Sequence, residues 1–84
     1  MEKKIFKTLV QEVHKLGKNK YVQGRISGMM NVICNKNNTI EHGVGYIPNV
    51  GHIYVAECTE SEYKKFAHRV EEYYPGLCKF DYKD

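Results

Sequence analysis

The sequence lacks most of the features that mark a specialised small protein. It has no tryptophan and only two prolines, and its three cysteines are too far apart to form the paired ligands of a structural zinc site. The longest apolar run, 53–56, is far too short to cross a bilayer, and no apolar run follows the charged N-terminal residues as it does in a signal peptide. We therefore expect a cytoplasmic protein with free thiols, no bound metal, no cofactor and no contact with a membrane.

Phosphate-binding motifs are also missing. The sequence contains neither a Walker A motif nor G-x-G-x-x-G, and the glycines between Gly43 and Gly51 lead into a strand rather than into a helix. The tripeptide Val22-Gln23-Gly24 resembles part of the acylphosphatase signature. Because a helix is predicted before it and no arginine-bearing loop leads into a helix, we interpret this match as a coincidence.

What the chain does contain is the pattern of a single small α+β domain over residues 1–84. Apolar residues at helical spacing predict a first helix over 3–17. A second helix is predicted over 60–74, because Thr59 and Glu62 have the spacing of a capping box.

Four strands complete the predicted fold. They are expected over 29–35, 39–47, 52–58 and 77–82, with turns over 36–38 and 48–51. The stretch 20–30 carries Gly24 and Gly28, and its pattern fits either a bulged strand or a loop. The expected order is therefore α-β-β-β-α-β, with two helices packed on one face of a mainly antiparallel sheet.

Charge is distributed unevenly along the chain. Residues 1–40 hold eight Lys or Arg and two Glu, whereas residues 41–84 hold five Lys or Arg and eight Asp or Glu. A nucleic-acid-binding domain that uses the basic half is the first alternative function, since cations and aromatic rings bind phosphates and bases. Its candidate residues are Lys18, Lys20, Tyr21, Arg25 and Lys36. The predicted order of helix, three strands and helix is similar to that of double-stranded RNA-binding domains.

Two sets of residues could carry catalytic or metal chemistry, and neither is complete. Cys58 lies two residues before the second predicted helix, whose N-terminus favours a thiolate, so a small enzyme with an activated thiol at Cys58 is the second alternative. The glutamates at 57, 60 and 62 oppose it, because nearby carboxylates raise a thiol pKa. His42 and His52 could meet across a hairpin, but scattered histidines do not predict a metal site. We predict that the protein is not an enzyme.

A protein-binding module is the main prediction. Tyrosine is enriched at protein interfaces, and the candidate contact residues are Tyr46, Tyr54, Tyr73 and Tyr74. A sheet edge could also accept a strand from a partner or from a second copy, which would give a homodimer. The frequent Lys, Asn, Ile and Tyr are typical of an AT-rich source, such as a Gram-positive bacterium or its phage. Size and composition resemble those of phage accessory proteins that inhibit host machinery in the infected cell, including anti-CRISPR proteins.

Overall fold

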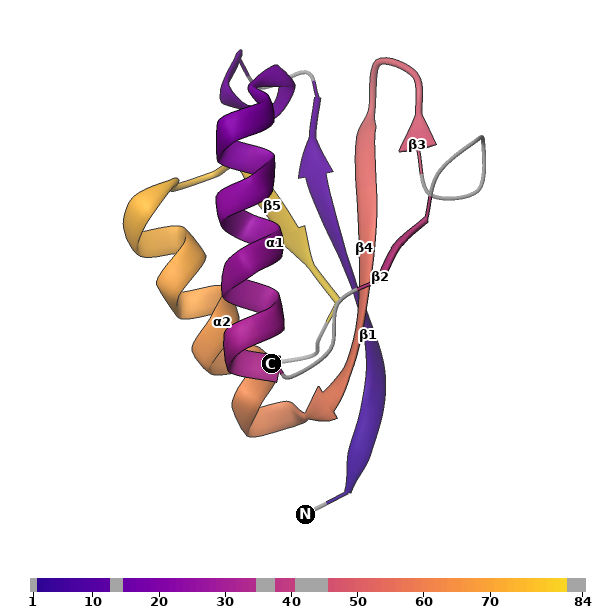
Figure 1. Ribbon diagram of the computed structural model, residues 1–84, viewed down its shortest axis with the longest axis vertical. Coiled ribbons are helices and arrows are strands. Elements are labelled where there is room, and N and C mark those ends of the chain that lie inside the picture. The colour runs from indigo at the N-terminus through magenta and orange to yellow at the C-terminus, as the bar shows by residue number, and fades with distance from the viewer. Residues whose placement is uncertain (1, 13–14, 35–37, 41–45, 82–84) are drawn as a thin grey trace.

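The computed structural model describes residues 2–12, 15–34, 38–40 and 46–81, and it shows an α+β fold (Figure 1). Five strands form one sheet in the described part of the chain, and both α-helices lie on the same side of it. In chain order the elements are β1 (Lys3–Gln11), the 3-10 turn η1 (Lys15–Lys18), α1 (Lys20–Cys34), β2 (Asn38–Ile40), β3 (Tyr46–Ile47), β4 (Gly51–Thr59), α2 (Glu60–Tyr73) and β5 (Cys78–Phe80).

The sheet is antiparallel throughout and is built around β1 and β4. Its order is β2-β4-β1-β5, and β3 also pairs with β4. The two central strands pair along their whole length, from Lys3 opposite Thr59 to Gln11 opposite Gly51. Helix α1 connects β1 to β2, and α2 connects β4 to β5, in each case with another strand lying between the two. This is the split βαβ arrangement, in which both helices cover one face of the sheet.

The prediction of a helix over 3–17 is wrong, because residues 3–11 form β1. Phe6, Thr8 and Val10 alternate toward the core, and Ile5 and Leu9 point the other way. A strand with apolar residues on both faces also places some of them at helical spacing, so its period of two is hidden. The buried polar Thr8 obscures the alternation further.

The prediction of a strand or loop over 20–30, followed by a strand over 29–35, is also wrong, because residues 20–34 form α1. Its buried residues recur at every fourth position: Val22, Ile26, Met30 and Cys34. The Asn19 side chain caps the helix by accepting the backbone amides of Tyr21 at 2.9 Å and Val22 at 3.4 Å. Packing of this face outweighs the low helix propensity of the two glycines.

The second half of the chain folds largely as predicted. β4 and α2 match their predicted ranges within a residue, and β5 covers the centre of the predicted last strand. The capping box is confirmed, since Thr59 Oγ1 accepts the Glu62 amide at 3.1 Å and the Glu62 carboxylate accepts the Thr59 amide at 2.9 Å. Two short strands, β2 and β3, stand where one strand over 39–47 was expected, and residues 41–45 lie outside the described part.

The described elements therefore follow the order β-α-β-β-β-α-β rather than α-β-β-β-α-β. The α+β class and the antiparallel pairing were predicted correctly, and the identity and position of the first helix were not. Tertiary packing determines the secondary structure of the first half of the chain. Local capping and turn signals determine that of the second half.

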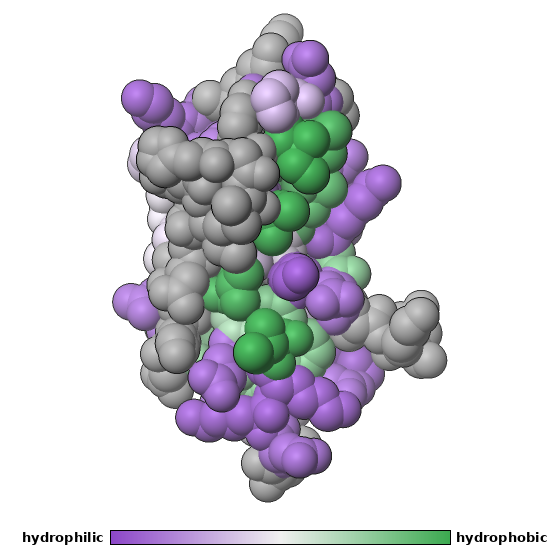
Figure 2. Space-filling view, turned by 90° about the vertical axis from the view of Figure 1, so that its right-hand side faces the viewer, coloured by the Kyte–Doolittle hydropathy of each residue, from purple (hydrophilic) through white to green (hydrophobic). Residues whose placement is uncertain are grey.

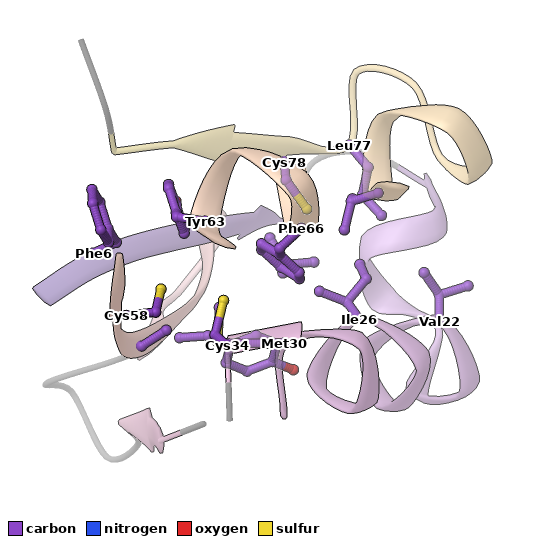
Figure 3. Packing of buried hydrophobic residues seen from close by; sticks show 14 residues of the cluster. Phe6, Val22, Ile26, Met30, Cys34, Cys58, Tyr63, Phe66, Leu77 and Cys78 are labelled. Carbon is purple, nitrogen blue, oxygen red and sulfur yellow. The ribbon is translucent and has the colours of Figure 1, made fainter. Parts of the chain in front are cut away.

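The core lies between the sheet and the two helices, with Phe66 near its centre and Tyr63 beside Phe6 toward one end (Figure 3). The Tyr63 ring stacks on Phe6 with 4.3 Å between ring centroids, and its side chain is fully buried. Its hydroxyl lies 2.7 Å from Thr8 Oγ1, donates to the Lys7 carbonyl oxygen at 2.9 Å and accepts the Asp81 amide at 3.1 Å. One phenol thus connects α2 to β1 and to the end of β5.

Replacing Tyr63 with phenylalanine should lower the free energy of unfolding by about 1–3 kcal/mol, because it leaves the buried Thr8 hydroxyl and the Lys7 carbonyl without this partner. Tyr73→Phe is the matched control, since its ring is half exposed, and it should change stability by less than about 0.5 kcal/mol. Urea unfolding followed by circular dichroism measures both. Equal stabilities of Tyr63→Phe and the wild type would contradict the assigned role of the hydroxyl.

Gly24→Ala and Gly28→Ala should each stabilise the fold by about 0.5–1 kcal/mol, because both glycines lie inside α1 and an added methyl group would meet nothing within 4 Å. Gly51→Ala is the opposite case. Gly51 has φ +149°, and a Cβ there would overlap the Val10 carbonyl oxygen, so this change should destabilise the protein. Thermal melting of the three variants tests the ranking, and a loss of stability in both helix variants would refute it.

Candidate functional site

An arginine lies between two tyrosine rings on the outer side of the helical layer. The guanidinium carbon of Arg25 is 5.8 Å from the ring centroid of Tyr21 and 5.7 Å from that of Tyr73. One guanidinium nitrogen of Arg25 also donates to the Tyr21 hydroxyl at 3.2 Å. Tyr74 adjoins the group, with 6.4 Å between its ring centroid and that of Tyr73. We call these four residues the Tyr–Arg patch.

The two helices create the patch by packing against each other. Tyr21 and Arg25 are one turn apart on α1, so their side chains lie on the same face. Tyr73 is the last residue of α2, where that helix reaches the beginning of α1 (Figure 1). The patch therefore depends on the tertiary fold, and its two halves are 48 residues apart between Arg25 and Tyr73.

The patch is exposed and carries a permanent charge. Tyr21 is 67% exposed and Tyr73 is 52% exposed, which are high fractions for large rings. The hydrogen bond to Tyr21 raises the pKa of Arg25 above its ordinary value, so the guanidinium stays protonated. Within the described part of the chain, no ion pair joins Arg25 to a carboxylate. Contacts with both rings hold the guanidinium in place, and its charge faces solvent.

The structure separates the four tyrosines that the sequence proposed for protein binding. Tyr73 and Tyr74 are in the patch. Tyr54 is only 4% exposed and packs in the core, so it cannot offer a surface to a partner, and we withdraw it as a contact residue. Tyr46 lies in β3, and its side chain is outside the part that the structure describes.

Residues proposed for nucleic-acid binding divide in a similar way. Tyr21 and Arg25 belong to the patch, and Lys20 is exposed at the first position of α1. The backbone of Lys18 lies in η1 without a described side chain, and Lys36 lies outside the described residues. The fold thus brings Tyr73 and Tyr74, predicted for protein binding, onto the same surface as Tyr21 and Arg25, predicted for nucleic-acid binding.

The same side of α1 continues beyond the patch to a residue that the sequence did not single out. Gly28 and Val32 follow Arg25 at helical spacing, and Val32 is 76% exposed. Val32 was placed in a predicted strand, where an apolar residue is expected to be buried. The 3.6-residue period of α1 places Val32 on the outer side of the helix, and this period was not recognised in the sequence.

A second exposed surface is the face of the sheet away from the helices. Figure 2 shows hydrophobic side chains separated by hydrophilic ones on the side that faces its viewer. Ile5 is 64% exposed on β1, and a shallow groove of about 450 Å³ nearby is lined by Lys7, Leu9, Ile53, Lys79, Phe80 and Asp81. The outward side chains of β1 and β4 include no aromatic ring, so these strands offer no platform for stacking bases.

The environment of Cys58 does not activate its thiol. Cys58 is fully buried, and burial raises its pKa, whereas a nucleophilic cysteine needs a lowered one. Cys34 lies beside it (Figure 3). The pKa of Cys34 is raised to about 12, mainly by burial and secondly by a hydrogen bond to Cys58. Cys78 is buried as well, and burial raises its pKa to about 12. The three thiols behave as small core side chains.

Other chemistry finds little support in the described residues. They include no group of three or more His, Cys, Asp or Glu side chains that could hold a metal ion. The His52 ring lies 3.5 Å from the Gln23 amide, and His42 is outside the described part. No helix described by the structure has the length and hydropathy needed to cross a membrane.

At about pH 8, iodoacetamide should label all three cysteines at least about a hundredfold more slowly in the folded protein than in urea. The reason is that thiolates are the reactive form and the buried thiols stay protonated until the structure opens. Mass spectrometry of peptides from timed samples gives each rate separately. Labelling of Cys58 in the folded state as fast as in urea would restore the activated-thiol interpretation.

The fold also bears on the two resemblances noted in the sequence. A strand, not a helix, is the first described element, so the order typical of double-stranded RNA-binding domains is not present. A strand does precede Val22-Gln23-Gly24, contrary to our prediction, but the tripeptide lies inside α1 and Asn19 already accepts the first amides of that helix. No family model matches the chain, and neither a curated protein nor a solved structure matches it.

Proposed function

We propose that the protein is a non-catalytic binding module that acts by occupying the surface of a protein partner through the Tyr–Arg patch. The observation that carries this proposal is the exposed Arg25 guanidinium held over Tyr21 and Tyr73. Tyrosine and arginine are the residues, with tryptophan, that contribute most binding energy at protein interfaces. Three of them in contact on a surface are well suited to that role.

The arrangement also lowers the entropic cost of binding. A free arginine side chain samples many rotamers, and fixing it in a complex costs about 0.5–1.5 kcal/mol. Here the hydrogen bond to Tyr21 and the contact with Tyr73 restrict Arg25 before a partner arrives. Tyrosine rings have few rotatable bonds, so they add apolar contact area at little further cost.

Nucleic-acid binding is the second candidate, and the position of Lys20 beside Tyr21 and Arg25 favours it. Charge on the helical layer opposes it. Together α1 and α2 carry five Lys or Arg and four Glu side chains, so this layer is close to neutral. A polyanion is bound mainly by releasing counterions from many phosphate contacts, which a nearly neutral surface supports poorly.

The proposed setting is the cytoplasm of a bacterium or of its phage-infected cell, where the module would inhibit a host protein. Its short chain and its frequent Lys, Asn, Ile and Tyr support this setting. A second copy could still use a sheet edge to form a homodimer.

Capture from bacterial lysate tests the proposal. The wild-type protein should retain a specific partner protein, and Tyr21→Ala with Tyr73→Ala should reduce that capture at least about tenfold, because two exposed rings of the patch are lost. His68→Ala is the control, since it is exposed on α2 about 140° around the helix from Tyr73. Thermal melting confirms that each variant folds.

The same experiment is run with and without nuclease. Capture that survives nuclease and depends on the two tyrosines supports a protein partner. Capture that disappears after nuclease treatment supports the nucleic-acid candidate and contradicts our proposal. Equal capture by the double variant and by His68→Ala would show that the patch is not the contact surface.

A further inference from the structure

We infer that the Tyr–Arg patch recognises an acidic side chain of its protein partner, and that an apolar side chain of the same partner segment packs near Val32. This inference rests on the proposed function and names the chemistry of the partner. It is carried by the charge of Arg25, which pairs with no carboxylate among the described residues, and by the continuation of the exposed side of α1 to Val32.

Arg25 has hydrogen-bond donors that its described contacts do not use. A guanidinium has five N–H donors in a planar fork, and the described contacts use one nitrogen for the Tyr21 hydroxyl. The rings of Tyr21 and Tyr73 contact its charge without accepting its remaining N–H groups as a carboxylate does. Asp and Glu side chains match the fork with two parallel hydrogen bonds. Arg25 is therefore ready to bind a carboxylate without rearranging.

The charges around Arg25 favour a single carboxylate over a chain of phosphates. Helix α1 contains no acidic residue, so a single carboxylate at Arg25 meets no repulsion from its own helix. Glu71 and Glu72 lie in the last turns of α2 and precede Tyr73 directly. An isolated carboxylate can avoid them, whereas a phosphate backbone with one charge at every nucleotide would have to pass close to them.

The distance between Arg25 and Val32 sets the spacing of the two contacting side chains in the partner. Val32 is seven residues after Arg25, which places it about 10 Å along the helix axis. Between them Gly28 has no side chain, and the space that its Cβ would occupy is open, so a partner can approach α1 closely there. A separation of about 10 Å corresponds to three residues of an extended segment or seven residues of a helix.

A selection from a displayed library of random 12-residue peptides tests the inference. The baits are the wild type, Arg25→Gln, Lys65→Gln and the double variant Tyr21→Ala with Tyr73→Ala. Arg25→Gln and Lys65→Gln each remove one positive charge from the helical layer. Lys65 is exposed on α2 and is not part of the patch. Peptides selected by the wild type and by Lys65→Gln should be rich in Asp or Glu, with an apolar residue three or seven positions away. Arg25→Gln should lose this enrichment.

Affinities of one selected peptide then measure the contact directly. Changing its acidic residue to the matching amide, or changing Arg25 to Gln, should each weaken binding at least about tenfold. Once Arg25 is Gln, changing the peptide's acid should have little further effect, as expected when two groups bind each other. Val32→Ser should weaken peptides that carry the apolar residue and leave the preference for the acid unchanged.

The outcomes separate this inference from the proposed function. Peptides that depend on Tyr21 and Tyr73 but carry no acid would overturn the inference and leave the binding function standing. The same acidic enrichment on wild type and Arg25→Gln would also overturn it, because another cation would then bind the acid. Failure to select any peptide that depends on the two tyrosines would contradict both. Tighter binding of a single-stranded oligonucleotide at Arg25 than of any peptide would assign the patch to phosphate instead.

Discussion

The fold depends on the hydroxyl group of Tyr63. It satisfies the buried Thr8 hydroxyl, the Lys7 carbonyl and the Asp81 amide at the point where β5 stops pairing with β1. Because a buried phenol must keep its hydrogen bonds, the bonds of Tyr63 set the distance between α2 and the sheet at this point. Tyr73 lies about 15 Å further along the same rigid helix, so the bonds at Tyr63 also determine where its ring meets Arg25.

The sequence predicts an element well when its signals are local. The capping box at Thr59 and the β-branched run of β4 are of this kind, and both were recognised. The first half of the chain depends on distant partners instead. Thr8 is an acceptable core residue only because Tyr63 lies opposite it, 55 positions later in the chain. Helix α1 forms despite Gly24 and Gly28, because one face packs against α2 and β4.

The candidate site was partly visible in the sequence. Tyr73, Tyr74, Tyr21 and Arg25 were each selected for their chemistry, but into two competing sets, since nothing in the sequence shows that α1 and α2 pack against each other. Tyr54 was misjudged for a different reason. Its neighbours Ile53 and Val55 are also apolar, so the sequence does not reveal that Tyr54 shares the buried face with Ala56 and Cys58.

The long pairing of β1 with β4 has a consequence for synthesis of the chain. β1 is made first, but its partner strand is complete only when Thr59 has been added, 48 residues after Gln11. At about 5–20 residues per second, the first strand spends several seconds without its main partner. During that time Lys3, Lys4 and Lys7 give the first five residues of the nascent strand three positive charges. Because charged side chains, lysine above all, disfavour edge-to-edge pairing of strands, these lysines oppose the association of unpaired β1 segments with one another.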